Sequence, residues 1–226
     1  MPTQVAQVRQ VVEVSQRARA DAVLLAGDVF DHNRQPVAVI DAAADLLRSV
    51  GVPVVILPGN HDPLTDDSVY RRGRLPDLDN VLVLGLADDG CRQVPGFDLS
   101  VWGRAHRDYR DMMPLRDPPA RAARWHVAMA HGHYLARRLP EAEQFRPSWL
   151  IHDDEIAATA ADYLALGHWN RPARVGGPSV PAYYSGSPDL AETVNLVILR
   201  DGAPAEVQRV PLASSQQSAV SNVADS

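Results

Sequence analysis

Four short stretches of the chain end an apolar run with glycine and with side chains that commonly bind metal ions. They read LLAGDVFD (residues 24–31), VVILPGNHD (54–62), VAMAHGH (127–133) and LALGHWN (164–170). In open α/β sheets, ligands bind in the crevice at the carboxyl ends of the strands. We therefore expect four residues to converge there: Asp28, Asn60, His131 and His168. Carboxylate, amide and imidazole groups together suit Mn, Fe or Zn, and the absence of thiolates disfavours a structural zinc site.

Each stretch alone has an ordinary structural explanation. A Gly-Asp pair after a strand is often a simple turn, GNHD could be a capping loop, and a single histidine is more often a core residue than a ligand. All four patterns in one chain favour a site. Gly27, Gly59 and Gly167 are expected to allow the sharp turn that carries each polar side chain over its strand end.

The apolar patterns predict the elements that position these residues. Residues 4–19 and 36–51 have the periodicity of helices, and residues 22–27, 53–59 and 81–85 are short buried strands. Buried strands between helices indicate a parallel sheet covered on both faces. Beyond residue 90, short strands predominate, with one helix near 153–161, and they predict a second sheet packed against the first.

Composition limits the classes of protein to consider. The chain has 226 residues, enough for one sizeable α/β domain or at most two small ones. Its net charge of −6 excludes the global basic field of nonspecific nucleic-acid binding. Eight arginines between residues 104 and 138 could form a local phosphate-facing patch or a solvated connection. Cys91 is the single cysteine, so no internal disulfide can form.

The sequence shows no recognisable targeting pattern. No apolar run reaches 18 residues and nothing has the order of a signal peptide, so we expect a cytoplasmic protein without membrane contact. Residues 213–226 are small and polar and are expected to form a disordered tail.

The motifs GDVFD, GNHD, a strand-terminal histidine and GH occur in an order that resembles the calcineurin-like metallophosphoesterase family. The stretches ADAVLLAGDVFD, DYLALGHWNRP and AYYSGSPDLAE further resemble the DNA-repair exonucleases that include the SbcD, Mre11 and YhaO-type proteins. The resemblance implies a four-layer α/β/β/α fold, in which two mixed sheets form a β-sandwich flanked by helices. It extends over residues 1–212 and implies a single phosphoesterase domain there, N-terminally incomplete.

The resemblance also implies a role for each motif residue. Asp28 would bridge two metal ions, with Mn expected and Fe or Zn as alternatives, and Asn60, His131 and His168 would complete the second metal's ligands. His61 would face the phosphate and stabilise or protonate the leaving oxygen, and Asp31 would orient His61. Asp62 would have a local structural role. Metal-activated water would then attack the phosphoester in line, without a covalent protein nucleophile.

The chain departs from the family pattern at the first metal. The family begins with a strand that carries Asp-x-His, which is absent here, and its final Gly-His-x-His motif reads Gly-His-Trp-Asn, with Asn170 in the last position. Either the chain is truncated or it is a degraded relative that binds one metal or none. Loss of an interior strand would leave buried ladder groups unpaired at about 1–3 kcal/mol each, which favours truncation. Asn170 predicts a weaker first metal site in both cases.

Three functions remain open at this point. The first is a phosphodiesterase or DNA exonuclease, with an SbcC/Rad50-like ATPase partner or a homo-oligomer as alternative assemblies. The second is a small-molecule phosphodiesterase or phosphatase of the same fold. The third is a catalytically impaired binding subunit. We expect roles for five further residues. His32 and Arg34 would line the cleft, His106 and His133 are candidate substrate contacts, and His152 would be a surface residue at a helix start.

Overall fold

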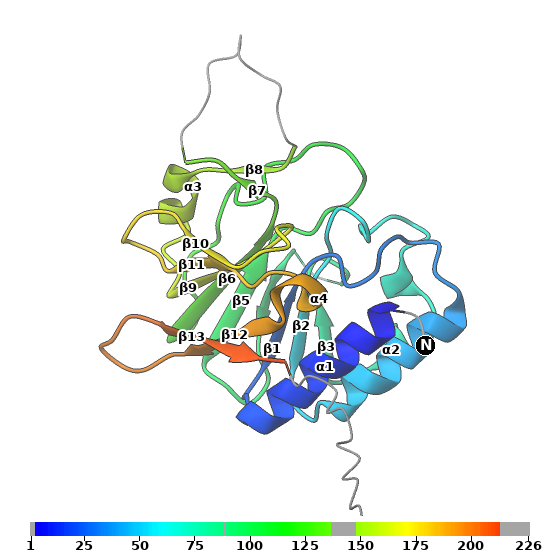
Figure 1. Cartoon of the computed structure of the whole chain (residues 1–226). Helices are drawn as coiled ribbons and strands as arrows, with labels where there is room; N and C mark the ends of the chain where they lie inside the picture. The colour runs from blue at the N-terminus through cyan, green and yellow to red at the C-terminus, as the bar shows by residue number, and fades with distance from the viewer. Residues whose placement is uncertain (1–2, 88, 137–147, 213–226) are drawn as a thin grey trace, which may run out of the picture.

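The computed structural model describes residues 3–87, 89–136 and 148–212, with the side chains of residues 3 and 4 left aside. Two sheets pack face to face, with two long helices on one outer side and a short helix on the other (Figure 1). This arrangement confirms the four-layer α/β/β/α fold, although of the two expected mixed sheets only the second is mixed and the described strands of the first are all parallel. The expected tail, residues 213–226, lies outside the described residues, as do Arg137 and Arg138.

The first sheet comes from the N-terminal third of the chain. Its strands are β1 (Val23–Ala26), β2 (Val54–Leu57) and β3 (Val81–Val83), all parallel and in the order β1-β2-β3. Helices α1 (Thr3–Ala18) and α2 (Val37–Ser49) cover its outer face. Every residue of β2 is buried, as its unbroken apolar run predicts for a strand covered on both faces.

The second sheet has six strands in the order β10-β11-β9-β6-β5-β4 and is mixed. Its centre is parallel, whereas β10 and β4 pair antiparallel at the two edges. The strands are β4 (Cys91–Gln93), β5 (Leu99–Gly103), β6 (Trp125–His131), β9 (Tyr163–Gly167), β10 (Ala173–Val175) and β11 (Ala182–Tyr184).

The remaining elements are short. They are β7 (His133–Tyr134) with β8 (Leu150–Ile151), α3 (Asp153–Ala158), α4 (Pro188–Ala191), the hairpin β12 (Thr193–Ile198) with β13 (Glu206–Pro211), and two 3-10 turns, Val69–Arg71 and Leu75–Asp77. The sequence predicted α3 and a series of short strands beyond residue 90, but it gave no sign of β7, β8, β10 or α4. The strands β7 and β8 have two residues each, which is too short to show the alternation of a strand.

The second sheet separates two hydrophobic clusters. Along β6, Val127 and Met129 point into the core shared with the first sheet, whereas Ala128 and Ala130 point to the opposite face. There they meet Ile156 of α3. The alternation follows from the two-residue period of a strand, and it places α3 as the fourth layer.

The two sheets approach closely at the carboxyl ends of their strands. A Cβ atom at Gly167, the last residue of β9, would overlap the carbonyl group of Ala26 at the end of β1, and one at Gly27 would overlap the His131 ring. Gly27 has φ +88° and makes the expected turn. Gly59 and Gly167 do not have positive φ values, so the chain bends after them without needing glycine's backbone freedom. At these two positions glycine is required because neighbouring atoms leave no space for a side chain.

Gly167→Ala is therefore expected to push β9 away from β1. Overpacking of this kind costs about 1–3 kcal/mol, so the free energy of unfolding in urea should fall by that amount. Gly177→Ala is the matched control, because a Cβ atom there meets nothing within 4 Å. Equal stability of the two variants would contradict the close approach of the sheets.

Candidate metal centre

Four side chains from both sheets meet where the parallel strands end. Asp28, Asn60 and His168 lie just beyond β1, β2 and β9, and His131 is the last residue of β6. Donor atoms of Asp28, His131 and His168 lie within 4.8 Å of one another. The Asn60 Oδ1 atom is 2.9 Å from His131 Nε2 and 3.2 Å from His168 Nδ1. The structure therefore brings together the four residues that the sequence selected as metal ligands.

His131 is held with one nitrogen directed at this cluster. Its side chain is 1% exposed, and Nδ1 donates to the Ala26 carbonyl at 2.8 Å. This bond leaves Nε2, 3.0 Å from Asp28 Oδ2, to face the cluster, which is the arrangement of a metal-binding imidazole. Burial alone would lower the pKa of His131, but the hydrogen bond and charge of Asp28 raise it. Burial alone would raise the pKa of Asp28, but the hydrogen bond and charge of His131 bring it below its usual value.

His168 offers a neutral imidazole. Burial, and then the neighbouring His131, lower its pKa to about 4, so its ring keeps a lone pair at neutral pH. Its backbone has φ +97°, and Asp28 has φ +53°. Left-handed conformations of non-glycine residues cost about 1–3 kcal/mol each and cluster at functional sites, so two of the four cluster residues are held against their backbone preference.

Aromatic packing fixes the turn that carries His168. The next residue, Trp169, stacks on Tyr184 with ring centroids 4.4 Å apart and an interplanar angle of 10°. Its Nε1 donates to His133 Nδ1 at 3.1 Å, and the Tyr184 hydroxyl donates to the Gly132 carbonyl at 2.8 Å. His133 thus contacts the turn beside the cluster.

One buried carboxylate ties the loop after β1 to the loop after β2. Asp62 is 0% exposed and accepts hydrogen bonds from the main-chain N–H groups of Asp28, Phe30 and Gly59, and from the Tyr70 hydroxyl at 2.6 Å. Burial and then the charge of Asp28 raise the pKa of Asp62, while these donors act in the opposite direction. The local structural role expected for Asp62 agrees with these bonds.

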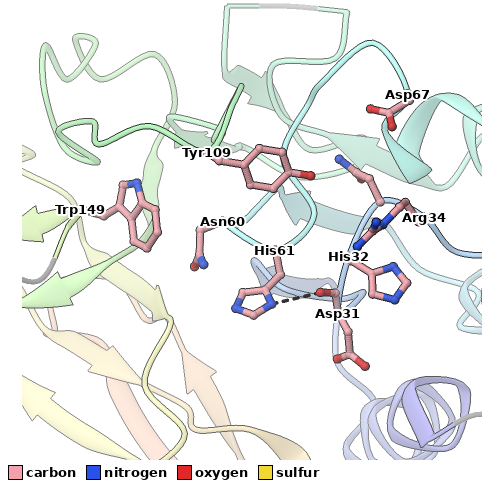
Figure 2. A pocket seen from close by; sticks show the side chains of 9 residues that line it. Asp31, His32, Arg34, Asn60, His61, Asp67, Tyr109 and Trp149 are labelled. Atoms are coloured by element: carbon pink, nitrogen blue, oxygen red, sulfur yellow. Dashed lines mark hydrogen bonds between the residues drawn. The ribbon is translucent and has the colours of Figure 1, made fainter.

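His61 lies beside the cluster with its side chain exposed. Its main-chain N–H donates to Asp28 Oδ1 at 2.9 Å, and its Nδ1 atom is 3.1 Å from the main-chain carbonyl of Asp31. Figure 2 shows this bond, with the Asp31 carboxylate turned away from the ring. The sequence expected the carboxylate of Asp31 to orient His61, and the structure gives that contact to its carbonyl. Either oxygen acceptor of Asp31, the expected carboxylate or the observed carbonyl, keeps the ring proton of His61 on Nδ1. The Nε2 atom of His61 then points away from Asp31.

A cleft of about 530 Å³ opens next to the cluster. Seven of its nine lining residues are polar or charged, and the other two are aromatic: Asp31, His32, Asn33, Arg34, Asn60, His61, Asp67, Tyr109 and Trp149. His32 and Arg34 line it as the sequence predicted. Sequence reasoning missed Tyr109 and Trp149, because loop residues without a motif give no signal of the surface they face.

Two other histidines lie elsewhere than expected. His106 is fully buried and donates from Nε2 to the His131 carbonyl at 2.9 Å, so it supports His131 from behind and does not face substrate. Burial lowers its pKa to about 4. His152 precedes α3 as expected, but it is buried and bonds the Leu135 carbonyl through Nδ1 at 2.7 Å. The surface position expected for it was wrong.

The family model for calcineurin-like phosphoesterases matches residues 2–191. The chain belongs to this family. Its members use divalent metals, and the cluster described above fits such an ion: four nitrogen and oxygen donors lie close together, one imidazole has its other nitrogen already bonded, and the cluster contains no thiolate. Within the described residues, no second group of three or more histidine, cysteine or acidic ligands meets the same distance criterion.

Several curated relatives are similar to the chain. The DNA double-strand break repair protein Mre11 of Sulfurisphaera tokodaii is 23% identical over 80% of this chain and 46% of its own length. The uncharacterized metallophosphoesterase YhaO of Bacillus subtilis is 23% identical over 80% and 44%. The SbcD component of the nuclease SbcCD of Bacillus subtilis is 25% identical over 87% and 60%. The chain thus spans about half the length of the relatives it matches.

A solved structure supports the fold. The protein TT1561 of Thermus thermophilus superposes with a TM-score of 0.57 at 13% identity, over 90% of this chain and 92% of that one. Separately, none of the helices in residues 3–87, 89–136 and 148–212 has the length and apolarity that a bilayer span requires.

His168→Asn is expected to weaken Mn²⁺ binding, measured by titration calorimetry at neutral pH. Loss of a hydrogen-bond partner behind a ligand lowers metal affinity about 10–100-fold, and loss of the ligand itself should cost at least as much. His32→Asn removes an exposed imidazole of the same cleft that lies outside the cluster and should leave the affinity unchanged. Equal effects of the two substitutions would contradict the assignment of His168 as a ligand.

Proposed function

We propose that the chain hydrolyses phosphodiesters at this centre with a divalent metal ion held by Asp28, Asn60, His131 and His168. The observation that carries the proposal is the position of His61, an exposed imidazole that lies in an open cleft and bonds the carboxylate of a metal-ligand residue through its main chain. The bound ion would supply Lewis-acid chemistry, activating water and neutralising phosphoryl oxygens. We infer Mn, with Fe or Zn as alternatives, and a dinuclear centre whose first site is weakened by Asn170, which stands where the family pattern has histidine.

We assign His61 the role of protonating the leaving oxygen of the ester. With its Nδ1 proton held by the Asp31 carbonyl, its Nε2 can carry a proton toward the cleft and give it to that oxygen. Asp31 is thus a positioning residue that acts through His61. Arg34, exposed in the same cleft, supplies a positive charge for the anionic ester.

Within phosphodiester hydrolysis, we propose a DNA exonuclease activity in the cytoplasm. Its support is the similarity to Mre11 and to SbcD, whose names describe DNA repair and a nuclease. An SbcC/Rad50-like ATPase or a second copy of this chain is the proposed partner. A small-molecule phosphodiesterase or phosphatase is the second candidate, favoured by the net charge of −6. A binding subunit without activity is the third, favoured by Asn170, which is exposed where the family pattern has a histidine.

His61→Asn is expected to lower kcat for bis(p-nitrophenyl) phosphate with Mn²⁺ by about 10²–10⁴-fold, because general acid catalysis contributes that much. Its Mn²⁺ affinity by calorimetry should stay near that of the unsubstituted protein, since His61 is not among the cluster ligands. Asp28→Asn should lose both affinity and activity. Tight Mn²⁺ binding without hydrolysis of this ester, single-stranded DNA or small nucleotides would instead support the binding subunit.

A further inference from the structure

Trp149 is fixed as one wall of the cleft. Its main-chain N–H donates to Asp111 Oδ1 at 2.6 Å, and its indole Nε1 donates to the Arg110 carbonyl at 3.0 Å. The rings of His106 and of the metal-ligand candidate His168 lie T-shaped to it, with centroids 5.3 Å and 5.8 Å away. A rigid aromatic ring therefore lies directly beside the metal centre and borders open space.

Tyr109 is the second ring of the cleft and is 63% exposed. A single exposed aromatic residue is ordinary on a protein surface and by itself indicates nothing. Tyr109, however, directly precedes Arg110 and Asp111, the two residues that hold Trp149. In Figure 2 its ring projects over the cleft, with Trp149 on one side and His32 and Arg34 on the other. One loop thus sets the position of both rings.

The chemical character of the cleft changes across its width. The side near Trp149 and Tyr109 offers two aromatic rings, whereas His61, His32 and Arg34 offer imidazole and guanidinium groups suited to a phosphate. A ligand that matches both sides carries an anion and a flat apolar ring. An acyl chain would need a continuous apolar wall, but the other seven lining residues are polar or charged.

We propose that Tyr109 and Trp149 form a subsite that stacks a nucleobase of the phosphoester whose phosphate lies at the metal centre. Stacking on aromatic side chains tolerates every base, because each base has a π-face. The subsite rests on the proposed function for the position of the phosphate. It adds a specificity element: the two rings distinguish a nucleotide from a phosphoester without a base.

The test compares two ligands that differ only in the base. Thymidine 5′-monophosphate and 2-deoxyribose 5-phosphate are titrated into the Mn²⁺-loaded protein by calorimetry. The nucleotide should bind about tenfold to a hundredfold more tightly. Tyr109→Ala should remove most of this preference while leaving the affinity for the sugar phosphate unchanged, and Tyr109→Phe should retain it because the ring face remains.

Two further variants control for indirect effects. Phe97→Ala removes another exposed aromatic ring, 39% exposed and outside the cleft lining, and should leave the preference intact. Trp149→Phe keeps a ring face but loses the indole bond to Arg110, and should reduce the preference less than Tyr109→Ala. The decisive substitution is at Tyr109, since a side chain this exposed can be removed without affecting folding.

The outcomes separate the subsite from the proposed function. Equal binding of the two ligands, or a preference that survives in Tyr109→Ala, overturns the subsite. Equal binding combined with hydrolysis of bis(p-nitrophenyl) phosphate overturns the subsite and leaves the hydrolase standing. A Tyr109-dependent preference without hydrolysis of any ester upholds the subsite and overturns the hydrolase.

Discussion

The buried carboxylate of Asp62 is the interaction on which the candidate site depends. Its two oxygens accept hydrogen bonds from three main-chain N–H groups and one hydroxyl in the loops after β1 and β2. Without it, four donors would be buried or strained without partners, each costing about 1–3 kcal/mol. The same bonds fix the loop that carries Asp28 against the loop that carries Asn60. A carboxylate that is not itself a candidate metal ligand thus determines where two of the candidates, Asp28 and Asn60, lie.

A second constraint joins the two sheets. The hydrogen bond from His131 Nδ1 to the Ala26 carbonyl crosses from β6 to β1, and it requires the close approach that Gly27 and Gly167 allow. The bond orients the imidazole and also fixes the distance between the strand ends. The unfavourable backbone conformations of Asp28 and His168 persist because this packing leaves them no alternative. The cluster is consequently preorganised by the fold itself.

The sequence predicted what depends on strand ends and little of what depends on loops. Apolar runs that stop at Gly-Asp, His-Gly or Gly-His identify strand ends, and parallel strands bring their carboxyl ends to one edge, so the convergence of His131 and His168 followed. The contact of His61 with Asp31 was predicted, but its chemistry was not, because a main-chain acceptor is present at every residue and leaves no mark in the sequence. Tyr109 was missed since its exposure depends on how a long loop folds.

The loop of residues 106–111 connects the metal centre to the cleft. At its start, His106 donates to the carbonyl of His131, and three residues later Tyr109 enters the cleft. Arg110 and Asp111 then hold Trp149, whose ring contacts both His106 and His168. The neutral His106 is buried between the metal-ligand candidate His131 and Trp149. The Trp149 ring therefore cannot shift far without disturbing His106 and His131. The proposed base subsite and the candidate metal centre therefore share one support.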